Sequence, residues 1–342
     1  MPTDRARSSL KVSVVICNYN YAHYILDAIG SVRDQEHPVH EIIVVDDGST
    51  DDSVQKVKQG AADVTLISKP NGGQITAYNA GFEQVTGDIV VFLDSDDRLK
   101  RDALARIAQA FSDERVMRVQ YMLRLIDNHG RPTEVVIPSM LSSGDKAGQV
   151  HQGVLFLASP GSGNAYRVSA LRRLMPLPET TEEKHGADFF TGYGSALLGL
   201  VCAIPSDLAE YRVHNQIDSE NLCFGNAKIG MTEAEMLQSR YRRFKRWIGE
   251  RLNVTITADR ATADFSVEKQ DYARAVFTPS GYGAGLLGGA QRLPFIYKSL
   301  RYRDSAWWFK SALMGWALIV LVLPRKLGMP LARYVCNPTS RV

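Results

Sequence analysis

Cysteine is scarce in this chain of 342 residues, and its spacing excludes two kinds of site. The four cysteines are scattered, at positions 17, 202, 223 and 336, and no Cys-x-x-Cys pair occurs. The sequence therefore predicts neither a zinc site built on thiolates nor a disulfide framework, and reduced thiols in the cytoplasm are expected. The polar N-terminal stretch MPTDRARSSLKV has no apolar core, so it predicts no signal peptide.

An excess of charge of one sign is also missing. Lys and Arg number 40 and Asp and Glu 37, and the resulting net charge of +3 does not by itself indicate nucleic-acid binding. Residues 240–246 are basic, but a solvated helix face explains them better than an anionic lipid or an acidic glycan, and no nucleic-acid partner is expected. With 45% hydrophobic and 23% charged residues, the composition is that of a globular protein with room for a large and a smaller domain.

Predicted strands and helices alternate over roughly the first hundred residues. Continuous apolar runs that indicate buried strands occur at 11–17, 41–47, 63–68 and 88–94. Helical spacing or helix-capping residues follow the first three of these runs, within 25–35, 48–60 and 71–87. This order predicts an α/β fold whose mixed, mostly parallel sheet is flanked by helices.

Polar side chains follow each of the four predicted strands at the point where the strand ends. The residues concerned are Asn18, Tyr19 and Asn20; Asp46 and Asp47; Asn71, Gly72 and Gly73; and Asp94, Asp96 and Asp97. Turn formation or helix capping would explain any one of these clusters. Four clusters at the carboxyl edge of one parallel sheet instead favour a ligand site, because ligands of such sheets bind at that edge.

Three carboxylates within four positions, at Asp94, Asp96 and Asp97, indicate that something positive lies among them. Like charges repel, and burying an unpaired carboxylate costs several kcal/mol. Oxygen ligands suit Mg²⁺ or Mn²⁺, and such an ion commonly shares its shell with substrate phosphates. The chain has neither a GxxxxGK[ST] loop nor a GxGxxG turn after its first strand. The sequence therefore predicts a divalent cation that helps to bind a diphosphate.

The segments VSVVICNYNYAHYI, EIIVVDDGSTDDS and NGGQITAYNAGFEQVTGDIVVFLDSDD, in this order, resemble the family 2 glycosyltransferases of the GT-A fold. The resemblance covers residues 11 to about 220. It implies an inverting enzyme that moves a sugar from a nucleotide diphosphate donor to a hydroxyl of a glycan, lipid-linked or other acceptor. It also implies a divalent metal cofactor, Mn²⁺ or Mg²⁺, and UDP is favoured over dTDP or GDP as the donor nucleotide.

The resemblance also assigns the donor side residue by residue. Tyr19 and Asn20 would lie by the nucleobase, Asp47 would hydrogen-bond to it, and Asp94 would approach the ribose or the metal. Asn71 and Gly73 are expected among the donor-binding residues as well. One departure is Tyr78, because the family often carries Arg at this position, next to the Asn-x-Gly motif of residues 79–81.

The metal and the base complete the expected site. The resemblance implies that Asp96 binds the metal, and that His214 in YRVHNQIDS reaches the metal or the diphosphate. Inversion needs a base on the acceptor side to take the proton of the attacking hydroxyl. Asp188 in HGADFF occupies the place of the family's acidic residue, and Glu182 and Glu183 are the competing candidates. A carboxylate that only caps a helix start is the structural alternative for Asp188.

Two other functions are compatible with an acidic α/β site. A sugar-nucleotide nucleotidyltransferase would carry a glycine-rich loop with basic residues after strand one, where this chain has CNYNYAHY. A non-catalytic nucleotide-sugar-binding protein would lack an acid at position 96 or 188, and both positions are acidic here. A glycosyltransferase is therefore the preferred interpretation.

The pattern changes after about residue 225. We expect a GT-A domain over 1–225 and a helical C-terminal region over 226–342. The apolar segment 306–323 would be roughly 27 Å long as a helix, which is at the lower limit for a membrane span. Both a buried packing helix and a membrane-associated helix fit this segment. The second would make the cytoplasmic protein peripheral on the inner face of the cell membrane.

Overall fold

The computed structural model describes residues 10–180, 184–214, 233–277, 281–303 and 305–336. The chain divides into two compact units. Unit 1 comprises Met1–Ala147, Ala158–Gln216 and Arg243–Val254. Unit 2 comprises Gly148–Leu157, Ile217–Arg242 and Thr255–Val342. The predicted domain boundary at residue 225 falls outside the described residues.

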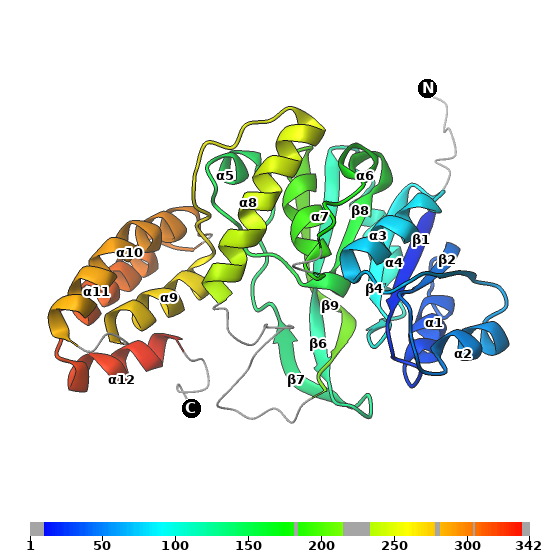
Figure 1. The fold of residues 1–342 in the computed structure, drawn as a ribbon, viewed down its shortest axis with the longest axis horizontal. Coiled ribbons are helices and arrows are strands. Elements are labelled where there is room, and N and C mark those ends of the chain that lie inside the picture. Colours follow the sequence, from blue (N-terminus) through cyan, green and yellow to red (C-terminus); the bar gives the residue numbers. More distant parts are fainter. Residues whose placement is uncertain (1–9, 181–183, 215–232, 278–280, 304, 337–342) are drawn as a thin grey trace, which may run out of the picture. The chain divides into compact units, whose positions relative to one another are not determined.

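The described part of unit 1 contains one sheet of nine strands (Figure 1). The strands are β1 (Val12–Asn18), β2 (Val39–Asp46), β3 (Thr65–Ser68), β4 (Ile89–Asp94), β5 (Arg98–Leu99), β6 (Val116–Ile126), β7 (Pro132–Ile137), β8 (Asn164–Arg167) and β9 (Leu200–Arg212). Their order is β3-β2-β1-β4-β8-β6-β9-β5, and β7 pairs with β6. The four strands predicted from apolar runs are β1 to β4.

The sheet is mixed but mostly parallel, as predicted. β1 pairs in parallel with β2 and β4, β2 with β3, and β6 with β9. The short strand β8 is antiparallel to both of its neighbours, β4 and β6. The register sets Asn18 opposite Asp46, and Cys17 opposite Asp94. The ends of β1, β2 and β4 are therefore level, and the polar residues that follow them share one edge.

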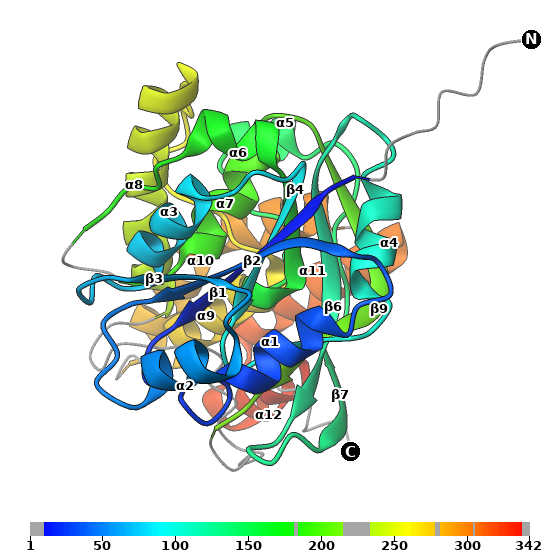
Figure 2. The same ribbon diagram turned by 90° about the vertical axis from the view of Figure 1, so that its right-hand side faces the viewer.

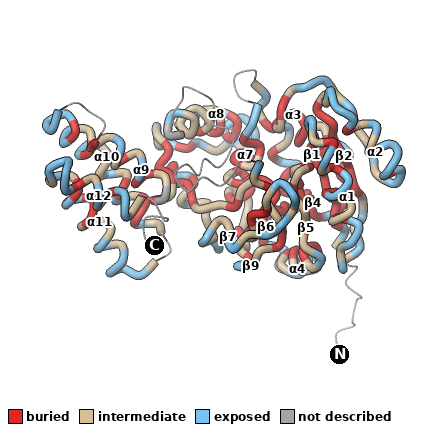
Figure 3. Tube along the Cα trace, turned by 90° about the horizontal axis from the view of Figure 1, so that it is seen from below, coloured by how far each residue is buried: buried red, intermediate tan, exposed pale blue. Residues whose placement is uncertain are grey.

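Helices cover both faces of the sheet in unit 1 (Figure 2). They are α1 (Ile25–Arg33), α2 (Ser53–Gly60), α3 (Gln74–Glu83), α4 (Ala103–Ala110), α6 (Val168–Leu174) and α7 (Ala187–Ser195). One set, α1, α2 and α4, lies on one face, and the other set, α3, α6 and α7, lies on the opposite face. Val14 and Ile16 of β1 pack with Ile25 and Ile29 of α1 in the core. The central strands β1 and β4 are accordingly buried along almost their whole length (Figure 3).

Unit 2 is helical in its described part. Its helices are α5 (Ala147–His151), α9 (Phe265–Phe277), α10 (Tyr282–Tyr302), α11 (Trp307–Val322) and α12 (Arg325–Cys336), and α8 (Glu233–Leu252) has residues in both units. Its core includes Tyr272, Ile296 and Trp316. The apolar segment predicted at 306–323 forms α11, which has 16 residues. Among the helices described, none is long and apolar enough to span a bilayer.

Candidate active site

The loop after β1 is fixed to the loop after β2 by polar side chains. Asn18 Nδ2 donates to Asp46 Oδ2 at 2.8 Å. Asn20 has a left-handed backbone, with φ at 59°, and its Oδ1 accepts the backbone N–H of Thr50 at 2.7 Å. Tyr19 lies between these two asparagines and is 47% exposed. These hydrogen bonds hold the loop against the loop after β2, and the Tyr19 ring is presented to solvent.

Asp47 is buried and organises the loop that follows β3. Its Oδ1 accepts hydrogen bonds from Lys69 Nζ at 2.6 Å and from the N–H of Gly72 at 2.9 Å, and its Oδ2 accepts the N–H of Gly73 at 2.6 Å. Lys69 also donates to the hydroxyl of Thr76 at the start of α3. Sequence reasoning did not single out Lys69, because a lysine at a strand end carries no motif of its own. The carboxylate of Asp47 therefore joins β2, the loop after β3 and α3.

The loop after β3 also contacts the segment that precedes α7. Lys184 Nζ donates to Asn71 Oδ1 at 2.8 Å. Gly73 has a φ of +89°, and a Cβ at this position would lie 2.2 Å from the Cβ of Lys184. Only glycine fits both this backbone conformation and this close approach. The structure thus brings the predicted donor residues Asn71 and Gly73 next to the chain segment that leads to Asp188.

Asp94, at the end of β4, is a carboxyl group in a negative environment. Burial, followed by the charges of Asp96 and Asp188, raises the pKa of Asp94 to about 7. A hydrogen bond from the side chain of Gln74 opposes this shift in part. Three predicted site carboxylates, two from the end of β4 and one from the start of α7, therefore lie close enough to interact.

Gln74, the first residue of α3, links the carboxylate of Asp94 to the start of α7. Its Oε1 accepts the N–H groups of Gly186 at 3.1 Å and Ala187 at 3.2 Å, while its side chain also bonds to Asp94. Asn79 lies further along α3. Its side-chain amide donates to the carbonyl of Leu177 and accepts the N–H of the same residue. Sequence reasoning did not assign a role to Gln74, since its backbone partners Gly186 and Ala187 lie more than one hundred residues away.

Asp96 and His214, two of the predicted metal ligands, lie in direct contact. Nε2 of His214 lies 2.6 Å from Asp96 Oδ2. The imidazole stacks on Tyr21, with ring centroids 5.1 Å apart, and lies 5.7 Å from the ring of Tyr24. Within the described residues, no group of three or more His, Cys, Asp or Glu side chains is arranged to hold a metal. The part of the chain that the structure describes offers a pair of ligands here.

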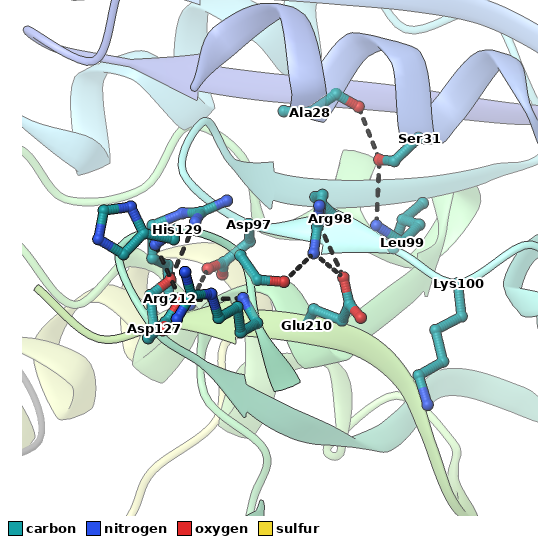
Figure 4. A network of polar contacts seen from close by, with 12 residues as sticks. Ala28, Ser31, Asp97, Arg98, Leu99, Lys100, Asp127, His129, Glu210 and Arg212 are labelled. Atoms are coloured by element: carbon teal, nitrogen blue, oxygen red, sulfur yellow. Dashed lines mark hydrogen bonds and ion pairs between the residues drawn. The ribbon is translucent and has the colours of Figure 1, made fainter. Parts of the chain in front are cut away.

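Asp97 lies in a different environment from Asp96, and Figure 4 shows it next to Arg212. Its Oδ2 accepts the hydroxyl of Ser162 at 2.6 Å, and its Oδ1 accepts the backbone N–H of Arg212 at 3.0 Å. The guanidinium of Arg212 donates to the carbonyl oxygen of Asp96 at 2.9 Å. Burial and the charge of Asp96 raise the pKa of Asp97 well above its usual value. Asp97 therefore fastens the end of β4 to β9 and to the 3-10 turn η1 (Gly161–Gly163).

Asp188 lies in the first turn of α7 and faces η1. Its Oδ2 accepts the N–H of Gly161 at 3.2 Å, and its Oδ1 accepts the N–H of Phe189 at 2.9 Å. Gly161 also adjoins Asp94, because a Cβ on this glycine would lie 3.0 Å from Asp94 Oδ2. One small residue thus separates the predicted donor carboxylate from the predicted base. The competing bases Glu182 and Glu183 lie outside the described residues.

Tyr78, the departure from the family pattern, is part of the core. It is 1% exposed, and its ring stacks on Phe92 of β4 with centroids 3.9 Å apart. Burial, followed by the charge of Asp94, raises the pKa of Tyr78 well above its usual value. This position therefore supplies an uncharged ring beneath Asp94 where an arginine would supply a cation.

Comparison with known proteins gives three findings. The model of glycosyl transferase family 2 matches residues 13–175. An uncharacterised glycosyltransferase of Nostoc sp. is 36% identical over 215 residues, which cover 60% of this chain and 65% of the relative. The putative teichuronic acid biosynthesis glycosyltransferase TuaG of Bacillus subtilis is 40% identical over 99 residues, covering 28% of this chain and 39% of the relative.

A solved structure agrees with the fold. TarS 1-349 of S. aureus in complex with UDP has a TM-score of 0.51 and 18% sequence identity, and the match covers 97% of this chain and 92% of that chain. The solved structure supports a GT-A-type fold, and the family model defines the class of residues 13–175 as glycosyl transferases. Residues 13–175 belong to glycosyl transferase family 2, which confirms the resemblance seen in the sequence. The chain spans 65% and 39% of the length of the Nostoc and Bacillus relatives.

Proposed function

We propose that the protein is an inverting glycosyltransferase that moves a sugar from a UDP-sugar to an acceptor hydroxyl. The observation that carries this proposal is the arrangement around Gly161. This residue donates to Asp188 through its N–H and adjoins Asp94 through its α-carbon. A reacting anomeric carbon in this region would have a donor-side carboxylate on one side and a candidate base on the other.

Asp188 acts as the general base in the proposed reaction. The acceptor oxygen attacks the anomeric carbon and forms the new glycosidic bond, while the bond from that carbon to the diphosphate oxygen breaks. The acceptor proton passes to a carboxylate oxygen of Asp188, and the nucleoside diphosphate leaves with the bonding electron pair. Attack opposite the leaving group inverts the anomeric configuration. The hydrogen bonds from Gly161 and Phe189 orient the carboxylate for this role, since positioning is the main requirement of such a transfer.

The donor nucleotide would lie along the loops after β1, β2 and β3. Tyr19 offers an exposed ring on which a base can stack. Asp47 would contact the base, and its carboxylate is already oriented by Lys69, Gly72 and Gly73. Asn20 and Asn71 border the same loops. The structural relative TarS was solved with UDP, which supports UDP as the donor nucleotide for this chain.

Asp96, His214 and Asp94 would hold a divalent cation, Mn²⁺ or Mg²⁺. Their donor atoms fit such an ion, because carboxylate oxygens are its preferred ligands and the mutual repulsion of Asp94 and Asp96 favours a positive neighbour. Substrate phosphate oxygens would complete the shell, as is usual for Mg²⁺. When bound, the cation supplies positive charge that stabilises the departing diphosphate. Gln74 would help to position Asp94 through the hydrogen bond between their side chains.

The acceptor in this proposal is a hydroxyl of a glycan or of a lipid-linked saccharide. The reaction would take place in the cytoplasm, with the protein peripheral on the inner face of the cell membrane. The relative TuaG is described as a teichuronic acid biosynthesis glycosyltransferase, which supports a polysaccharide or its precursor as the acceptor class.

A panel of nucleotide sugars tests the proposal. Purified protein is incubated with UDP-, dTDP- and GDP-sugars and Mn²⁺ or Mg²⁺, and the released nucleoside diphosphate is measured. We expect release from UDP-sugars, and a product anomer opposite to that of the donor in its NMR spectrum. Product with the donor's own anomeric configuration would contradict the inverting mechanism. Formation of UDP-sugar and pyrophosphate from UTP and a sugar 1-phosphate would instead establish a nucleotidyltransferase.

A further inference from the structure

The last three helices of unit 2 carry charge of one sign only. α10, α11 and α12 contain no Asp or Glu. Their cations are Arg292, Lys298, Arg301, Lys310, Arg325, Lys326 and Arg333. The whole chain is nearly neutral, with a net charge of +3, so this part of unit 2 is a local concentration of positive charge.

The outward side of α10 and α11 is apolar. Leu287 and Tyr297 on α10 are 61% and 59% exposed, and Trp308, Ile319 and Val322 on α11 are 61%, 50% and 59% exposed. Within each helix these residues are spaced so that they fall on one side, since neighbours on a helix face recur every three or four positions. We call these five residues the α10–α11 face.

The opposite sides of the two helices face the core of unit 2. Gly285, Gly289 and Ile296 of α10 are buried, and Gly285 and Gly289 lie close to Val276 of α9. The hydroxyl of Tyr282, at the start of α10, donates to the carbonyl of Val322, at the end of α11, at 2.9 Å. The two helices therefore run antiparallel and in contact (Figure 1). Each helix already packs into the core of unit 2 through its buried residues, so its exposed apolar residues are additional to that core.

Cations stand beside this apolar face. Arg301 is exposed in the last turn of α10, and Arg325 and Lys326 are exposed at the start of α12, which follows α11 directly. Exposed tryptophan and tyrosine next to basic residues are typical of helices that lie in the interface of a bilayer. None of the described helices is long and apolar enough to cross the bilayer.

We propose that the α10–α11 face docks on a membrane surface that contains anionic lipids. The apolar side chains would enter the boundary between headgroups and acyl chains, and Arg301, Arg325 and Lys326 would contact lipid phosphates. A second copy of this chain is a poorer occupant, because it would bring two sets of cations together without a single acidic residue on these helices. This inference does not depend on the proposed sugar transfer.

Vesicle sedimentation with the full-length chain tests this inference. We expect binding to phosphatidylcholine vesicles that contain phosphatidylglycerol, and much weaker binding to phosphatidylcholine alone. The double variant Leu287→Glu/Ile319→Glu should not bind the vesicles that contain phosphatidylglycerol, because both charges would enter the apolar boundary. Arg325→Gln and Lys326→Gln should each weaken binding about fivefold, the effect of one cation near an anionic surface. The control is the double variant Val135→Glu/Met140→Glu, which adds the same charge at two exposed positions of unit 1. It should bind the vesicles as the unaltered chain does.

Two outcomes would overturn the proposal. One is binding of the Leu287→Glu/Ile319→Glu variant equal to that of the unaltered chain, with circular dichroism showing both folded. The other is a dimer of the unaltered chain in sedimentation velocity that the same two substitutions dissociate, together with no vesicle binding. Quenching of tryptophan fluorescence by brominated lipids gives an independent measurement, and Trp308→Phe should reduce it.

Discussion

Asp96 and Asp97 are neighbours in the chain, but their carboxylates have opposite surroundings. Asp96 lies 2.6 Å from the imidazole of His214 and remains partly exposed. Asp97 is buried, and Ser162 and the backbone N–H of Arg212 occupy its two oxygens. In the acidic cluster after β4, Asp97 therefore links distant segments of the chain by hydrogen bonds, whereas Asp96 is available to a ligand.

This difference predicts that the two alanine variants lose stability to very different extents. Asp97→Ala leaves the buried hydroxyl of Ser162 and the N–H of Arg212 without their acceptor, which should lower the free energy of unfolding by about 1–3 kcal/mol for each unsatisfied group. Asp96→Ala should change it by less than about 0.5 kcal/mol. Urea unfolding followed by circular dichroism gives both values. Equal destabilisation by the two variants would contradict the assignment.

Asp96 should also make donor binding depend on a divalent metal. Titration calorimetry with UDP and Mn²⁺ should show weaker binding by Asp96→Ala, and EDTA should weaken binding by the unaltered chain to the same level. Asp113→Ala is a matched control, since Asp113 is a carboxylate in unit 1 that pairs with Arg115 away from the site. UDP affinity that is unchanged by EDTA would exclude the proposed metal.

Asp188→Asn separates proton transfer from donor binding. The amide keeps an acceptor oxygen for the N–H of Gly161 but accepts no proton, so the initial rate of sugar transfer should fall about 10²- to 10⁴-fold. The donor dissociation constant should change little, and slow hydrolysis of the donor by water should persist. Initial rates and donor titrations on the same preparation give both quantities. A near-normal transfer rate would move the search for the base to Glu182 or Glu183.

Gln74 should act as a positioning residue through two separable contacts. Gln74→Leu removes the contact with the start of α7 and the contact with Asp94. A slightly misplaced base should lower kcat about 10- to 100-fold. The KM for the donor should rise. Gln74→Glu keeps the acceptor for Gly186 and Ala187 but adds a negative charge beside Asp94. It should therefore restore kcat and raise the donor KM. Identical kinetic constants for the two variants would show that these contacts do not act separately.

Glu268 in unit 2 predicts a pH-dependent stability. Burial raises the pKa of Glu268 above its usual 4.5, although its Oε1 accepts the N–H of Ala263. Its contribution to stability is therefore complete below about pH 4.5 and is lost as the pH rises through the raised pKa. Glu268→Gln keeps the acceptor without the charge, so it should raise Tm at about pH 8 and leave it unchanged at about pH 4. A Tm difference that is the same at both pH values would contradict this.

The strands and the edge of the site could be predicted from the sequence because their signals are local. Continuous apolar runs gave β1 to β4, and the polar residues directly after them, such as Asp47 and Asp94, had to lie at the carboxyl edge of a parallel sheet. The position of β8 between β4 and β6 was not predicted, because its four residues carry no pattern that distinguishes them from a loop.

The roles within the site depend on partners far away in the chain. Asp97 could not be told from Asp96 without Ser162 and Arg212, which lie 65 and 115 positions away from it. Gln74 has no motif, and its function follows from its contacts with Asp94 and with the start of α7. The sequence shows which side chains reach the edge, whereas packing decides which of them remain available to a substrate.

The antiparallel strand β8 separates two groups of parallel strands that come from different stretches of the chain. β1, β2, β3 and β4 are complete by Asp94, whereas β6 and β9 begin only at Val116. In the proposed reaction, the first stretch recognises the nucleotide sugar, and the second carries Asp188, the acceptor side and one metal ligand, His214. Recombination at one point in the gene could therefore replace the acceptor half as a block. Descendants of one ancestor would then attach the same sugar to different polymers.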